Sequence, residues 1–125
     1  MTTMSTKITI ALGVVIIIIA AVTWSLTQKN QDGLILYYGD GCSHCANVEK
    51  FLADNAIEQK VQVQKKEVYQ NQKNAQELGQ RAAKCGLPSD NVGIPVLWDG
   101  TNCLVGDQDI INFFQKNYVD VEQKI

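Results

Sequence analysis

The chain has 125 residues, which suffices for one domain of ordinary size, and its formal net charge is −2. Its 11 lysines and arginines form no basic stripe or arginine cluster, so we expect no nucleic-acid partner. The 4 cysteines and the single histidine are the residues from which a chemical function can be inferred.

Residues 8–26 are almost continuously apolar and carry no charge. A helix of nineteen residues is about 29 Å long, close to the hydrocarbon thickness of a bilayer. The stretch predicts one N-terminal transmembrane helix, preceded by a short tail at 1–7 and followed by a polar linker at 27–33. A cleaved signal peptide is the alternative, although its apolar region is usually shorter and no clear Ala-x-Ala site follows here.

The charges around this stretch predict its orientation. Lys7 precedes it, whereas Lys29 and Asp32 follow it. Because positive charges favour the cytoplasmic side, we expect the N-terminus inside. The rest of the chain would then lie outside a single-pass cell membrane, in the periplasm or extracellular space.

The remaining residues, 34–125, show the patterns of alternating strands and helices. Leu34 to Tyr38 is apolar throughout, as in a strand covered on both faces, and helical spacing follows at 45–55. The later predicted elements, in chain order, are a strand at 61–68, a helix at 71–84, a loop at 86–93, strands at 94–98 and 103–105, and a helix at 107–118. This order predicts an α/β domain.

The pairing of the strands follows from the same order. The first two strands should pair in parallel through a right-handed crossover. Asp99-Gly100 is a hairpin turn signal, so the last two strands should pair antiparallel.

Cys42-Ser43-His44-Cys45 lies between the first strand and the first helix of this domain. Two cysteines at this spacing can form a reversible disulfide, and a helix N-terminus favours the thiolate form of the first sulfur. The thiolate is the nucleophile of disulfide exchange. Cys-x-x-Cys also occurs in zinc sites, but its position between a strand and a helix favours redox chemistry.

A strand leading into Cys-x-x-Cys, the element order, and Ile94-Pro95 about fifty residues later resemble the thioredoxin fold. The small size is similar to that of the glutaredoxin-like branch. The resemblance covers 34–118 and implies a β-α-β-α-β-β-α order with a mixed four-stranded sheet flanked by helices. It also implies that Pro95 is cis and faces the disulfide, which leaves the backbone of Ile94 free to bind an extended substrate.

The resemblance assigns roles within the motif. Cys42 would be the nucleophile and Cys45 the resolving thiol. His44 could stabilise the Cys42 thiolate by charge or by a hydrogen bond, and a histidine at this position resembles the oxidising members of the superfamily, DsbA and the protein disulfide isomerases. An ordinary exposed surface residue is the alternative for His44.

Several features of those families are absent from the sequence. Leu36 occupies the place of thioredoxin's buried acid, and Gly41 that of its tryptophan. The lysine that glutaredoxins place before their motif to hold glutathione is missing between Tyr38 and Gly41. Asp107 matches the glutaredoxin aspartate that binds glutathione's amino group, but it is equally an ordinary helix cap.

Cys85 and Cys103 form the second cysteine pair. A structural disulfide is favoured in an oxidising compartment. Two buried free thiols, a second redox couple that relays electrons to Cys42–Cys45, and a zinc site built from all four cysteines are the alternatives.

The sequence thus predicts a membrane-anchored thiol–disulfide oxidoreductase that acts on protein thiols and disulfides without a cofactor or metal. A membrane-bound or soluble redox partner would complete its cycle. The alternatives are a glutathione-linked, glutaredoxin-like reductase and a non-enzymatic docking module that keeps the fold.

Overall fold

The computed structural model describes residues 2–27, 33–121 and 123. The chain divides into two compact units, Met1–Gln31 and Asp32–Ile125. The first unit holds helix α1 (Thr2–Thr27). The structure does not support the transmembrane span predicted at 8–26: within the described part of the chain, no helix combines the length and the apolar character of a membrane crossing.

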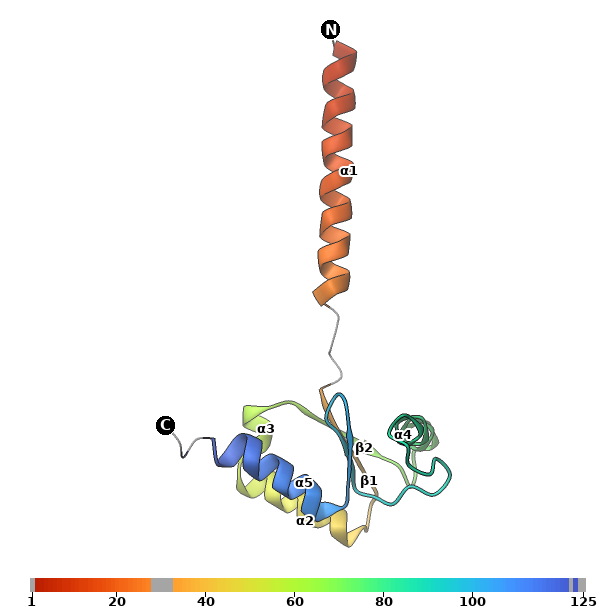
Figure 1. The fold of residues 1–125 in the computed structure, drawn as a ribbon, viewed down its shortest axis with the longest axis vertical. Coiled ribbons are helices and arrows are strands. Elements are labelled where there is room, and N and C mark those ends of the chain that lie inside the picture. The colour runs from red at the N-terminus through yellow and green to blue at the C-terminus, as the bar shows by residue number, and fades with distance from the viewer. Residues whose placement is uncertain (1, 28–32, 122, 124–125) are drawn as a thin grey trace. The chain divides into compact units, whose positions relative to one another are not determined.

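The second unit is a mixed α/β domain. Its elements, in chain order, are β1 (Leu34–Tyr38), α2 (Ser43–Asp54), α3 (Ile57–Lys60), β2 (Val63–Glu67), α4 (Gln72–Lys84), β3 (Val96–Trp98), β4 (Cys103–Val105), α5 (Asp107–Phe114) and the π-helical turn η1 (Gln115–Val119) (Figure 1).

The four strands form one sheet in the order β2-β1-β3-β4. β1 pairs in parallel with β2, and both β1–β3 and β3–β4 are antiparallel. The predicted crossover pair and the predicted hairpin are therefore confirmed. At the hairpin turn, Asp99 Oδ1 accepts hydrogen bonds from the backbone N–H groups of Thr101 at 2.8 Å and Asn102 at 2.6 Å, and Gly100 has a φ of +99°. The architecture is compatible with a thioredoxin-like fold.

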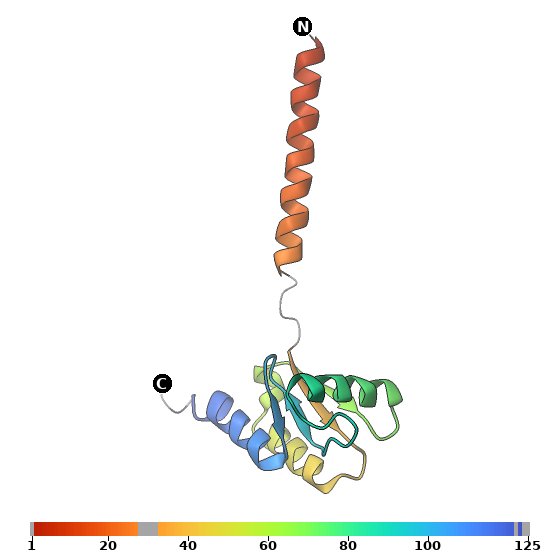
Figure 2. The same cartoon turned by 45° about the vertical axis from the view of Figure 1, so that its right-hand side comes forward.

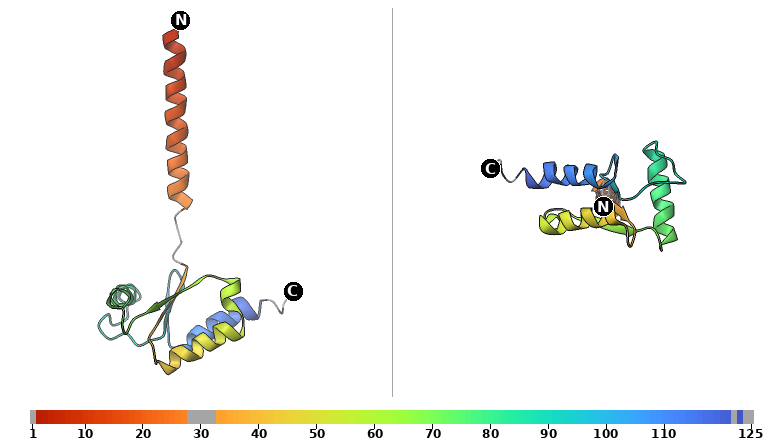
Figure 3. Two further views of the ribbon diagram at one scale, coloured as in Figure 1. Left: turned by 180° about the vertical axis from the view of Figure 1, so that it is seen from behind. Right: turned by 90° about the horizontal axis from the view of Figure 1, so that it is seen from below.

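The central strand β1 is covered on both faces, as its apolar sequence predicts. Leu34 and Leu36 pack in one core cluster with residues of α2 and α5, whereas Ile35 and Tyr37 pack in a second cluster with Leu78 of α4. Figures 1 and 3 accordingly show α2 and α5 side by side on one face of the sheet, with α4 on the other. Figure 2 shows the sheet between these two layers.

Several elements differ from the sequence prediction. β2 covers Val63–Glu67 rather than 61–68, and α2 covers Ser43–Asp54 rather than 45–55. β3 begins at Val96 rather than Ile94, because Pro95 has no N–H to donate to the strand ladder. The short helix α3 was not predicted, and its Ile57 is fully buried in the first core cluster. The last α-helix ends at Phe114, and the chain continues as the π-helical turn to Val119, which packs against the same cluster.

Candidate active site

Four loops meet at one edge of the sheet. β1 and β2 are parallel and end together, since Tyr38 is paired with Glu67. β3 starts at this same edge, because Val96 is paired with Tyr37, and β4 ends there, because Val105 is paired with Val96. The edge therefore brings together the segment carrying the Cys42 motif, the turn after Glu67, the residues before Val96 and the start of α5.

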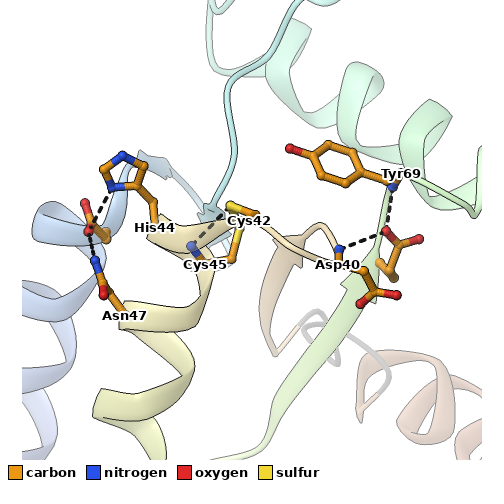
Figure 4. The surroundings of a disulfide bond; sticks show 8 residues. Asp40, Cys42, His44, Cys45, Asn47 and Tyr69 are labelled. Atoms are coloured by element: carbon orange, nitrogen blue, oxygen red, sulfur yellow. Dashed lines mark hydrogen bonds and ion pairs between the residues drawn. A yellow bond between two sulfur atoms is a disulfide. The ribbon is translucent and has the colours of Figure 1, made fainter.

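Cys42 and Cys45 are joined by a disulfide with a Cα–Cα distance of 5.2 Å. Cys42 is the N-cap residue of α2, and its sulfur accepts a hydrogen bond from the backbone N–H of Cys45 at 3.2 Å (Figure 4). Cys42 is half-buried, whereas Cys45 is only 1% exposed. Cys42 is therefore the more exposed of the two cysteines, and it lies at a helix N-terminus, a position that favours a thiolate.

The turn before Cys42 is held closely against two neighbouring loops. The backbone N–H of Cys42 donates to the Gly39 carbonyl at 3.1 Å. A Cβ atom at Gly39 would lie 2.8 Å from Ile94 Cδ1 and nearer still to the ring of Tyr69, so a side chain here would have to displace both neighbours. The Tyr69 side chain covers this turn while remaining 63% exposed (Figure 4).

Glu67, at the end of β2, fixes two of these loops with one carboxylate. It accepts hydrogen bonds from the backbone N–H groups of Tyr69 at 2.7 Å, Gln70 at 2.8 Å and Asn71 at 3.2 Å. The N–H of Asp40 also contacts it, at 3.4 Å (Figure 4). Partial desolvation raises the pKa of Glu67, but these four N–H groups together hold it below its ordinary value.

His44 contacts Asp107 from the neighbouring helix α5. Its Nδ1 lies 3.1 Å from Asp107 Oδ2, and Asn47 Nδ2 donates to the same oxygen at 2.7 Å (Figure 4). The Asp107 side chain is 14% exposed and that of His44 69%. Hydrogen bonds from Asn47 and then from His44 hold the pKa of Asp107 below its ordinary value.

Ile94 and Pro95 lie beside this site, at the position that the register with β1 gives them. The Ile94–Pro95 peptide bond is cis, as predicted. Pro95 is buried, and its carbonyl accepts the backbone N–H of Gly106 at 2.9 Å. This bond ties the segment before β3 to the start of α5, which carries Asp107.

Cys85 and Cys103 are joined by a second disulfide, with a Cα–Cα distance of 6.0 Å. Cys103 is paired with Trp98, which is paired with Ile35. Ile35 lies three residues, or about 10 Å, from the end of β1 that leads to Cys42. The two disulfides therefore lie at opposite ends of the sheet, and their four sulfurs do not converge on a common zinc site.

The structure shows the surroundings of two residues at which the sequence departs from thioredoxin. Leu36 is fully buried in the first core cluster and offers no proton-transfer group. Gly41 has a φ of +79°, a conformation that a side chain at this turn would strain.

Sequence reasoning did not single out Asn47, Glu67 or Tyr69 as parts of the site. Asn47 follows His44 by three residues, a spacing that places both on one side of a helix. This spacing was the only sequence signal that could have pointed to Asn47. Glu67 and Tyr69 join the site through the register of β2 on β1.

The chain matches no known family model, and no curated protein resembles it in sequence. A disulfide-forming Cys-x-x-Cys pair at a helix N-terminus in this α/β fold is compatible with thiol–disulfide redox chemistry.

Proposed function

We propose that the protein is a thiol–disulfide oxidoreductase of the thioredoxin superfamily that exchanges disulfides with protein thiols through Cys42. The observation that carries this proposal is the unequal placement of the two sulfurs. Cys42 is half-buried at the N-cap of α2, and Cys45 is buried one turn further along. This arrangement supports Cys42 as the nucleophile and Cys45 as the resolving thiol.

The exchange runs in two steps in the oxidising direction. A substrate thiolate attacks the Cys42 sulfur, a mixed disulfide forms, and Cys45 leaves as a thiolate. A second substrate thiolate then attacks the substrate sulfur of the mixed disulfide, and Cys42 leaves as a thiolate. The substrate loses two protons and two electrons and gains a disulfide, and the reverse sequence reduces a substrate disulfide.

An extended substrate segment would lie along Ile94 and Pro95. Ile94 packs against the turn that carries Cys42, and the backbone before β3 is outside the strand ladder. A protein segment suits this edge, because backbone pairing needs no particular side chain. His44 would stabilise the Cys42 thiolate.

The glutathione-linked alternative has weaker support. Asp107, the residue that would bind the amino group of glutathione, already contacts Asn47 and His44. The sequence also lacks the lysine that would pair with a glutathione carboxylate.

The experiment is a trap for the mixed disulfide. Cys45→Ser should accumulate adducts with protein thiols that dithiothreitol releases, because Cys42 can no longer be resolved internally. Cys42→Ser should accumulate none, and the Cys85→Ser/Cys103→Ser double variant should behave as the parent chain. Equal adducts from Cys45→Ser and Cys42→Ser would contradict the proposal.

The docking-module alternative makes a different prediction for the reduced protein. A redox enzyme should show a Cys42 pKa, measured from the alkylation rate against pH, below the free-thiol value of about 8.5. A docking module needs no such shift, and a value at or above about 8.5 would favour it.

The location of the domain is a separate proposal that rests on the sequence alone. We propose that residues 8–26 anchor the chain in the cell membrane with the domain outside. Carbonate extraction of membranes should leave the full chain in the pellet, and a protease added outside intact cells should cleave the domain. Release of the chain by carbonate would overturn the proposed membrane anchor. Protection of the domain from the protease would overturn its proposed location outside the cell.

A further inference from the structure

We propose that Asp107 is a positioning residue for His44, and that it sets the oxidising strength of the Cys42–Cys45 couple through that histidine. The inference rests on the proposed thiol–disulfide exchange function. It concerns a contact between two helices, α2 and α5, whose partners lie 63 positions apart in the sequence.

The geometry fixes which nitrogen of His44 carries hydrogen. Asp107 Oδ2 accepts from Asn47 Nδ2 at 2.7 Å and lies 3.1 Å from His44 Nδ1. A carboxylate has no hydrogen to give, so Nδ1 is the donor and Asp107 the acceptor. Nε2 is then the ring nitrogen that this contact does not use.

Hydrogen bonds from neighbouring residues hold the Asp107 carboxylate in place. It is the first residue of α5, and its other oxygen accepts the backbone N–H of Gln108 at 3.1 Å. Asn47, one turn after His44 on α2, keeps the carboxylate in place when the ring moves. Two side chains of α2 therefore converge on one oxygen of α5, which orients the imidazole without occupying Nε2 (Figure 4).

The consequence for Cys42 follows from where this ring is held. The Asp107 carboxylate beside Nδ1 fixes the orientation of the imidazole, as an acid does for the histidine in other nucleophile–histidine–acid arrangements. His44 lies in the first turn of α2, two residues after Cys42, so a ring held there can stabilise the thiolate. A stabilised thiolate favours the reduced couple and makes the disulfide a stronger oxidant.

The test is a double-mutant cycle on the equilibrium between the Cys42–Cys45 couple and a glutathione redox buffer, in the full chain. Asp107→Asn keeps an oxygen acceptor of the same shape and removes the charge. It should lower the equilibrium constant for oxidation of glutathione by the protein twofold to fivefold, a modest change because the ring is exposed and solvent screens its contact with the carboxylate. This corresponds to about 10–20 mV for a two-electron couple.

The second arm repeats Asp107→Asn in a His44→Gln background, where the change should have no effect on the equilibrium constant. Asp109→Asn, in the same helical turn, is the matched control for loss of a negative charge, and it should leave the constant unchanged or raise it slightly. The Cys85→Ser/Cys103→Ser background removes the second disulfide from the measurement.

Two results would overturn the inference. One is an equal effect of Asp107→Asn with and without His44, which would mean that the carboxylate acts on the fold or on Cys42 directly. The other is no effect in either background. Neither result bears on the proposed function, because the equilibrium is measurable even if the trap with Cys45→Ser captures no protein.

Discussion

At the residue scale, the turn before Cys42 depends on the absence of a side chain at Gly39. A methyl group there would lie 2.8 Å from Ile94 Cδ1 and would also meet the Tyr69 ring. Gly39→Ala should therefore lower the free energy of unfolding by about 1–3 kcal/mol, the usual cost of overpacking. It should also change the alkylation rate of reduced Cys42, because the displaced ring and loop border that residue. Chemical denaturation and alkylation kinetics measure the two effects.

Gly93→Ala is the matched control, because a Cβ atom at Gly93 would have no heavy atom within 4 Å. It should change the unfolding free energy by less than about 0.5 kcal/mol, as surface substitutions usually do. Similar losses from the two glycine variants would show that backbone flexibility, rather than the contact with Ile94 and Tyr69, is what Gly39 supplies.

Some residues of the site could be predicted from sequence and others could not. The cysteine spacing and Ile94-Pro95 are local patterns, and both the Cys42–Cys45 disulfide and the cis bond are present. The contacts of His44 with Asp107, and of Glu67 with Asp40, join distant segments. They depend on how strands and helices align in space, which no local pattern encodes.

At the element scale, Glu67 joins the end of β2 to the turn before α4. The pKa of its carboxyl group is lowered in the folded state, so its hydrogen bonds contribute stability above the ordinary value of about 4.5. This contribution is lost as the pH falls from there through the lower folded-state pKa. Glu67→Gln should therefore reduce stability at neutral pH and flatten its decline in acid, as measured by denaturation at several pH values.

The control for Glu67 is Glu49→Gln. Glu49 is partly exposed, with 38% of its side chain accessible, and its ion pair with Lys65 has an N–O distance of 3.9 Å. Such surface pairs contribute little, so this variant should keep the decline in acid seen in the parent chain. An unchanged decline in Glu67→Gln as well would contradict the role given to the four N–H contacts.

The Cys85–Cys103 disulfide links the end of α4 to β4 across a sequence separation of 18. In the chain-entropy description, closing a loop of this size stabilises the folded state by about 3 kcal/mol. The Cys85→Ser/Cys103→Ser double variant should lose about this free energy of unfolding. It should keep the alkylation rate of reduced Cys42 within about twofold, since the two disulfides lie at opposite ends of the sheet. A folded variant that had lost exchange activity would instead support a redox relay.

Elements whose apolar residues in the sequence are also the buried residues of the structure could be predicted from sequence. β1 and α4 are examples. The helix α3 has no such signal: it follows Ala56, which has a φ of 49°, and its Ile57 is buried by tertiary packing. The same packing draws Tyr118 and Val119 toward the first core cluster through a π-helical turn. Propensity alone gives no reason to end the α-helix at Phe114.

At the scale of the whole molecule, the chain consists of two units with a boundary between Gln31 and Asp32. Both core clusters consist of residues from 34 onward. A chain of residues 32–125 should therefore fold alone, with a thermal midpoint within about 3 °C of the full protein and the same Cys42 reactivity. Calorimetry and alkylation measure both properties. A midpoint lowered by more than about 10 °C would show that residues before 32 stabilise the domain.

The spacing of the four cysteines also bears on how the reduced chain first becomes oxidised. The native pairs are separated by 3 and 18 positions, and every non-native pairing between them closes a much longer loop. Because the entropy cost of closure rises with loop length, each sulfur meets its native partner more often than a wrong one. Synthesis proceeds from the N-terminus, so Cys42 and Cys45 are together before Cys85 exists. The order of the sulfurs along the chain thus favours correct oxidation without help from the finished fold.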